Sequence, residues 1–158
     1  MRVAVLTISD TVARGLGEDL SGPAIVSMCR GLGWELIATE IISDELPGIQ
    51  ESLRSKADSG RLDIILTVGG TGIGPRDNTP EATQNIADRV VPGVAEEIRR
   101  VGLTHTPMAV LSRGVCAVRA KTLIINLPGS PKGATQSLEA IVHLLPHAVK
   151  VLNGARHD

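Results

Sequence analysis

The chain has 158 residues, of which 42% are hydrophobic, and a formal net charge of −1 at pH 7. This length fits one domain over residues 1–158 and is sufficient to bury most of the apolar surface. A balanced charge without a basic cluster argues against a nucleic-acid partner, and no apolar stretch approaches the roughly 20 residues that span a bilayer.

Composition also constrains the core and the location. Phe and Tyr are absent and Trp34 is the only aromatic residue, so the core must consist of Val, Ile, Leu and Ala. Cys29 and Cys116 fit no metal-ligand pattern, and we expect both to be buried free thiols in a reducing cytoplasm. No signal-peptide pattern precedes the first predicted strand, which agrees with a cytoplasmic location. His143 and His147 share a helical face and could bind a metal, although surface polarity is the simpler explanation.

Predicted strands and helices alternate along the chain. In chain order the pattern gives a strand (Arg2–Ser9), a polar loop (Asp10–Gly17), a helix (Leu20–Leu32), a strand (Glu35–Ile42), a turn (Ser43–Gly48), a helix (Ile49–Ser59), a strand (Leu62–Val68), two helices (Thr79–Asp88 and Val94–Gly102), two short strands (Met108–Leu111 and Thr122–Leu127) and a final helix (Gly133–Leu152). This alternation predicts a three-layer α/β/α fold with a mostly parallel central sheet.

One connection in this pattern is irregular. About ten residues separate Leu111 from Thr122, too few for an ordinary helical crossover between parallel strands. These two strands should therefore run antiparallel. We expect Met108–Leu111 to be the reversed strand, because Thr122–Leu127 leads into a glycine-containing loop at its carboxyl end.

The stretch from Thr67 to Ala82 is the most informative part of the chain. Glycines at 69, 70 and 72 follow an apolar run, and they allow a sharp turn and a close approach of the backbone to a ligand. Asn78 or Thr79 can then begin a helix, whose free N–H groups form an anion site. The glycine spacing does not match a dinucleotide fingerprint, and the Gly-Lys-Ser/Thr end of a P-loop is missing. A tight turn without a ligand remains an alternative.

Three further polar segments should meet this loop at the same sheet edge, since ligands bind beyond the carboxyl ends of parallel strands. Ser9-Asp10-Thr11 follows the first strand, Ser43-Asp44-Glu45 follows the second, and Pro128-Gly129-Ser130-Pro131-Lys132 opens the last helix. Two anion-binding loops and several carboxylates at one edge suit a substrate with phosphates on both halves and a carboxylate-bound Mg²⁺.

Simpler structural roles remain open for each key residue. Asp10 could form an Asx turn or a helix cap, and Asp44 could cap the helix after it. Asp77 could be a turn residue or an ion-pair partner of Arg76, and Ser130 could be an N-cap, a role compatible with phosphate binding.

Together the motifs Val68–Gly72, Pro75–Ala82, Leu111–Arg113 and Ile124–Gly133 resemble the molybdopterin adenylyltransferases. These include bacterial MogA and MoaB proteins and the corresponding domains of plants and of animal gephyrin. The resemblance implies a homotrimer that transfers AMP from MgATP to molybdopterin and that could contact other molybdenum-cofactor assembly proteins. Two alternatives are a non-catalytic molybdopterin-binding or scaffold trimer and a molybdenum-inserting enzyme, although the latter normally carries additional domains.

The resemblance also assigns roles to residues. It implies that Asp44 and Asp77 are catalytic, and we expect both to bind the Mg²⁺ of the nucleotide. The predicted substrate-binding residues are Ser9, Asp10, Thr11, Gly69, Gly70, Thr71, Gly72, Ser112, Arg113, Pro128, Gly129, Ser130 and Lys132. A phosphate monoester is already ionised at neutral pH, so the transfer needs no strong general base, in agreement with motifs that contain no histidine.

Overall fold

The computed structural model describes residues 1–155 and contains one six-stranded sheet with the strand order β2-β1-β3-β6-β5-β4. The strands are β1 (Arg2–Ile8), β2 (Glu35–Ile42), β3 (Ile64–Val68), β4 (Arg89–Val90), β5 (Cys116–Arg119) and β6 (Thr122–Leu127). The neighbours β2, β1, β3 and β6 pair in parallel, whereas β5 pairs antiparallel with both β6 and β4. The predicted mostly parallel sheet is therefore confirmed.

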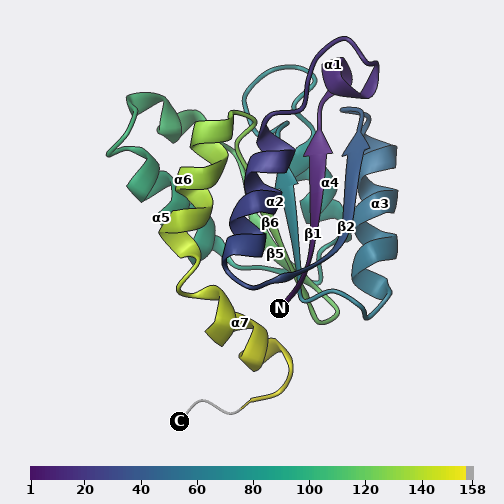
Figure 1. Ribbon diagram of the computed structural model, residues 1–158, viewed down its shortest axis with the longest axis vertical. Helices are drawn as coiled ribbons and strands as arrows, with labels where there is room; N and C mark the ends of the chain where they lie inside the picture. Colours follow the sequence, from purple (N-terminus) through teal and green to yellow (C-terminus); the bar gives the residue numbers. More distant parts are fainter. Residues whose placement is uncertain (156–158) are drawn as a thin grey trace.

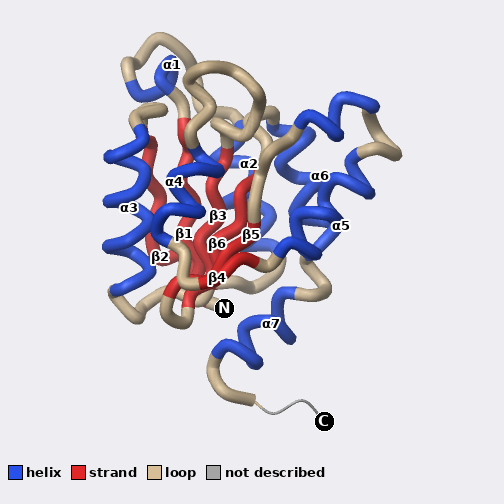
Figure 2. Tube along the Cα trace, turned by 180° about the vertical axis from the view of Figure 1, so that it is seen from behind, coloured by secondary structure: helices blue, strands red, loops and turns tan. Residues whose placement is uncertain are grey.

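Helices cover both faces of this sheet. They are α1 (Asp10–Ala13), α2 (Ser21–Gly31), α3 (Leu46–Asp58), α4 (Thr79–Ile86), α5 (Pro92–Gly102), the 3₁₀ helix η1 (Pro107–Leu111), α6 (Pro131–Ile141) and α7 (Leu145–Leu152). Helices α2, α5, α6 and α7 pack on one face, while α3 and α4 cover the other (Figures 1 and 2). The three-layer α/β/α prediction is thus confirmed. Among the described residues, none of the helices has the length and apolar character needed to cross a membrane.

The core consists of two apolar layers, one on each face of the sheet. Alternate residues of β1 show the division, since Val3 and Val5 pack under α2 whereas Ala4 and Leu6 pack under α3. Such strands are buried on both faces, as parallel strands between helices must be. Cys29 and Cys116 are buried free thiols, as predicted, and burial raises the pKa of Cys29 to about 11 and that of Cys116 to about 12.

The prediction of a reversed strand at Met108–Leu111 is wrong. These residues form η1, which begins after Thr106, whose hydroxyl accepts a hydrogen bond from the Met108 N–H at 3.3 Å. Pro107 suits the first position of a helix, and Met108 is 62% exposed, so this apolar run is not a buried strand. The reversed strand is Cys116–Arg119, which pairs antiparallel with β6.

The predicted final helix is two helices. Helix α6 ends at Ile141 and α7 begins at Leu145, with a turn between them. Pro146 has no N–H to donate to the Val142 carbonyl, which explains why one helix cannot run through this point. In addition, Asp10–Ala13 forms the short helix α1 instead of a loop, and α3 begins at Leu46 within the predicted turn.

Candidate functional site

The loops that follow β1, β2, β3 and β6 lie together at one edge of the sheet. Backbone hydrogen bonds tie them in pairs: the Ser9 N–H donates to the Ile42 carbonyl at 2.9 Å, and the Gly69 N–H donates to the Leu127 carbonyl at 3.0 Å. This edge, where α1 lies in Figure 1, is where open α/β sheets bind ligands.

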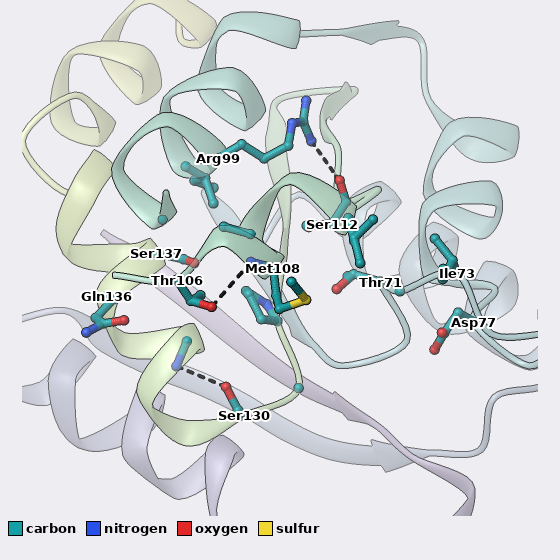
Figure 3. A pocket seen from close by; sticks show the side chains of 18 of the residues that line it. Thr71, Ile73, Asp77, Arg99, Thr106, Met108, Ser112, Ser130, Gln136 and Ser137 are labelled. Carbon is teal, nitrogen blue, oxygen red and sulfur yellow. Dashed lines mark hydrogen bonds between the residues drawn. The ribbon is translucent and has the colours of Figure 1, made fainter. Parts of the chain in front are cut away.

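Two adjoining cavities occupy this edge. The larger cavity, of about 530 Å³, lies between the glycine-rich loop and the segments α5, η1 and α6. Figure 3 shows Thr71 and Asp77 on one side of it and Ser130, Gln136 and Ser137 on the other. The smaller cavity, of about 330 Å³, lies between the loops after β1, β2 and β3 and includes Asp44. Gly70, Asp77 and Gly129 line both cavities and so form their common wall.

The glycine-rich loop needs glycine at two positions. Gly69 and Gly70 have φ values of 105° and 65°, in the left-handed region that residues with a Cβ rarely adopt. A Cβ on Gly70 would also lie 2.3 Å from the Thr79 hydroxyl and 3.1 Å from Asp44 Oδ1. The glycines therefore do make a tight turn, and that turn places bare backbone beside Asp44 in the wall between the cavities.

Asp44 is held by a reciprocal pair of hydrogen bonds with Asp10. The Asp10 N–H donates to Asp44 Oδ2 at 2.8 Å, and the Asp44 N–H donates to Asp10 Oδ1 at 3.0 Å. Asp44 does not cap the following helix, because Glu45 occupies the N-cap position without a side-chain bond. Burial raises the pKa of Asp44, and the nearby charges of Asp10 and Asp77 raise it further.

Arg76 forms ion pairs at this edge with residues other than Asp77. Its guanidinium donates to both Asp10 oxygens, at 2.9 and 3.1 Å, and to Glu45 at 2.9 Å. The hydrogen bonds from Arg76 lower the pKa of Asp10. Asp77 instead acts as a turn residue, since its Oδ2 accepts the Gly74 N–H at 2.8 Å. The Asp10 carboxylate is thus occupied by protein groups, and Asp10 lines neither cavity.

Ser130 is the N-cap of α6, which is the simpler structural role that the sequence left open for it. Its hydroxyl accepts the Gly133 N–H at 3.1 Å, and it lines the larger cavity together with Pro128 and Gly129. A capped helix start facing a cavity is also a suitable anion site. Lys132, in the first turn of the same helix, lines neither cavity.

The structure brings most of the remaining predicted residues to the cavities and leaves others outside. Ser9 and Gly69 line the smaller cavity, and the larger cavity is lined by Thr71, Gly72 and Ser112. Thr11 and Arg113 line neither of these two cavities.

Several lining residues were absent from the sequence-based set. In the larger cavity these are chiefly apolar residues of α5 and η1, including Ile98, Met108 and Leu111. The wrong strand prediction concealed Met108 and Leu111, whereas Ile98 lies in a helix that was predicted correctly. In the smaller cavity Thr7 donates to Asp19 Oδ2 at 2.6 Å, and Asp19 Oδ1 accepts the Gly22 N–H at 2.9 Å. An aspartate just before a predicted helix is a recognisable capping signal that could have indicated Asp19.

The carboxylate oxygens at the smaller cavity are chemically suited to a magnesium ion. Asp44 and Asp77 each have one carboxylate oxygen held by a backbone N–H, while their Oδ1 atoms accept no hydrogen bond from residues 1–155. Mg²⁺ typically binds one or two carboxylates together with phosphates and waters. Within residues 1–155 no group of three or more His, Cys, Asp or Glu side chains is placed to hold a metal by itself.

Comparison with known proteins identifies the family of this chain. Residues 4–147 match the family described as a probable molybdopterin binding domain. The chain belongs to this family. It is 39% identical over 156 residues to a molybdopterin adenylyltransferase of Helicobacter pylori, in an alignment that covers 98% of this chain and 89% of that one. The corresponding Escherichia coli protein is 35% identical over 169 residues, with 98% and 86% covered.

Similarity to a solved structure indicates the same family. A crystal structure of the molybdopterin biosynthesis enzyme MoaB from Thermus thermophilus superposes with a TM-score of 0.91 and 53% identity, covering 99% of both chains. The family resemblance predicted from the sequence motifs is therefore confirmed.

Proposed function

We propose that this protein is a molybdopterin adenylyltransferase of molybdenum cofactor biosynthesis. It transfers AMP from MgATP to the terminal phosphate of molybdopterin and releases pyrophosphate. The observation that carries this proposal is the pair of cavities with a common wall, in which Asp77 faces both cavities and Asp44 faces the smaller one. Relatives with this activity in their names match nearly the whole chain.

The two cavities suit different substrates. The smaller cavity contains Glu18, Asp19, Asp44 and Asp77, so a triphosphate enters it favourably only together with its cation. The larger cavity combines hydroxyl groups with an apolar wall that includes Met108, which suits a flat heterocycle such as a pterin. Phosphates from the two sides then meet at the wall formed by Gly70, Asp77 and Gly129.

In the transfer, an oxygen of the terminal molybdopterin phosphate attacks the α-phosphorus of ATP. A new phosphorus–oxygen bond forms, the bond to the bridging oxygen of the β-phosphate breaks, and pyrophosphate leaves with that electron pair. The backbone N–H groups of Gly70–Gly72 hold phosphate oxygens, and Ser130 with the start of α6 holds the pterin phosphate. The attacking phosphate is already ionised, so the protein mainly positions the two substrates.

Asp44 and Asp77 would hold the magnesium ion that accompanies the triphosphate. When bound, this ion reduces the repulsion between the two phosphate groups. Both carboxylates have an oxygen available for this role, and the backbone N–H groups on their other oxygens fix their orientation. We also propose a homotrimer in the cytoplasm, which could contact other cofactor-assembly proteins.

A second candidate is a trimer that binds molybdopterin or presents a scaffold without catalysing transfer. It is favoured by the identity of 53% to a protein named MoaB, against 40% to one named MogA. Incubation with molybdopterin, ATP and Mg²⁺ separates the two candidates. The transferase gives adenylylated molybdopterin and one pyrophosphate per product, with label from the α-phosphate of ATP in the pterin product. Molybdopterin binding without pyrophosphate release would favour the second candidate.

A further inference from the structure

Arg113 connects two parts of the site without lining either cavity. It lies between η1 and β5, and its guanidinium donates to the carbonyls of Gly72 at 2.7 Å and Asp77 at 2.8 Å. The same group forms an ion pair with Glu81, in the first turn of α4. Its backbone N–H donates to the Thr71 carbonyl at 2.8 Å. All three guanidinium nitrogens are therefore engaged by the segment 72–81.

These contacts close the loop that carries Asp77. The two carbonyls that Arg113 binds belong to residues 72 and 77, so one planar group joins both ends of the loop. Inside the loop, the Asp77 carboxylate accepts the Gly74 N–H. The side chain and the carbonyl of Asp77 are thus both fixed, and a shift of the loop would move the carboxylate away from Asp44.

A side chain of α5 fixes the backbone on both sides of Arg113. Arg99 donates to the carbonyls of Ser112 at 3.4 Å and Gly114 at 3.0 Å, on either side of Arg113; the bond to Ser112 is drawn in Figure 3. A rigid anchor of this kind is what precise placement of a catalytic carboxylate requires.

We infer that Arg113 is a positioning residue, which holds the loop 72–77 so that Asp77 faces Asp44 across the smaller cavity. It does not bind substrate phosphate. The catalytic part of this inference rests on the proposed AMP transfer, whereas the effect on the loop does not. Glu81 neutralises the guanidinium, which further reduces its value as a phosphate ligand.

Replacement by lysine separates positioning from phosphate binding. A lysine keeps the positive charge and can still attract a phosphate, but it lacks the planar fork that reaches two carbonyls and a carboxylate at once. Arg113→Lys should therefore loosen the loop while leaving the local charge unchanged.

The experiment measures amide hydrogen exchange and steady-state kinetics of Arg113→Lys. We expect exchange at residues 71–78 to rise at least about tenfold, and kcat to fall by about tenfold to a hundredfold because the carboxylate is displaced. The KM for MgATP should rise by less than kcat falls, since the displaced Asp77 also holds the magnesium ion but no side chain that binds phosphate is lost. Arg119→Lys is the matched control, because Arg119 also binds a carboxylate twice (Asp58, 2.8 Å each) and a carbonyl (Ile86, 2.8 Å) but lines neither cavity. It should change neither the exchange at 71–78 nor kcat.

Unchanged exchange at 71–78 in Arg113→Lys would overturn the inference, as would a raised KM for MgATP with normal kcat. If Arg113→Lys does not fold, Glu81→Gln provides the same test. Positioning predicts a lower kcat in that variant, whereas a phosphate ligand released from its carboxylate would lower the KM for MgATP. If the wild-type protein releases no pyrophosphate, the proposed transfer fails, but the exchange experiment still decides whether Arg113 holds the loop.

Discussion

Asp77 has one carboxylate oxygen bound to the Gly74 N–H at 2.8 Å and the other available to a ligand. Asparagine can accept the same bond through its amide oxygen, so Asp77→Asn removes the charge and retains the turn. We expect AMP transfer to fall by roughly a hundredfold or more, because a charge at the reacting phosphates is lost. Pyrophosphate release measures this effect, and thermal unfolding should give a nearly unchanged Tm. Full activity with Mg²⁺ would contradict the role of Asp77 as a metal ligand.

We predict that Asp44 promotes AMP transfer but lowers the free energy of unfolding at neutral pH. Its pKa lies above the ordinary value of 3.8, chiefly because of burial; the charges of Asp10 and Asp77 also raise it, whereas the hydrogen bond from the Asp10 N–H and the charge of Arg76 lower it. Between 3.8 and the raised pKa the folded state binds more protons than the unfolded state, so the free energy of unfolding falls as pH rises through this window. At neutral pH the ionised Asp44 is therefore destabilising.

Asp44→Asn should consequently have a Tm equal to or above that of the wild type at pH 7, although it loses AMP transfer. The gain in Tm should shrink as pH falls below the pKa of Asp44, where the wild-type carboxyl is also neutral. Thermal unfolding from about pH 3 to about pH 8 without Mg²⁺ tests this sign. A variant that is less stable at pH 7 and recovers in acid would show that the ionised form is stabilised instead.

At the scale of elements, the start of α6 combines a structural and a binding role. Ser130 caps the helix, and loss of such a cap costs about 1 kcal/mol, or roughly 2–4 °C in Tm for a chain of this size. Ser130→Ala should show this loss and, in addition, a weaker affinity for molybdopterin in a binding titration. Thr135→Val is the matched control, because the Thr135 hydroxyl bonds only carbonyls of the same helix and lines neither cavity. Equal molybdopterin affinity in both variants would limit Ser130 to capping.

Elements with a strong local pattern were predictable, and those decided by tertiary packing were not. The buried runs of β1, β3 and β6 and the glycine turn after β3 carry their own signals. The strand Cys116–Arg119 is only four residues long and is stabilised by pairing with β6, which no local pattern reveals. The apolar run Met108–Leu111 looked like a strand because sequence alone does not show that its side chains remain exposed beside the larger cavity.

The site was predictable to the extent that sheet topology determines it. Loops after parallel strands must meet at one edge, and this placed Asp44 and Asp77 together. Contacts that depend on side-chain reach were not predictable. Arg113 and Asp10 looked like substrate ligands, yet protein groups occupy both side chains. Their partners lie between 32 and 66 positions away in the chain, too far apart for any sequence spacing to indicate them.

At the scale of the whole molecule, the described surface retains apolar side chains that a homotrimer could cover. Leu20, Ile73 and Val110 are 59%, 70% and 62% exposed, and the strand β2 forms an unpaired sheet edge. Since the assembly that we propose from the family resemblance is a homotrimer, sedimentation equilibrium should give a mass of about three times 16.6 kDa. A mass of 16.6 kDa at micromolar concentration would contradict the trimer and would leave the proposed transfer untouched.

The fold as a whole brings the loops after β1, β2, β3 and β6 to a single edge, and the central claim is that Asp44 and Asp77 act there on one magnesium–triphosphate group. A double-mutant cycle tests it, with the affinity for MgATP measured by calorimetry in the wild type, Asp44→Asn, Asp77→Asn and the double variant. If both carboxylates serve the same ion, the two losses should be non-additive, with a coupling energy of about 1 kcal/mol or more. Losses that add to within about 0.5 kcal/mol would show independent carboxylates and would contradict the claim.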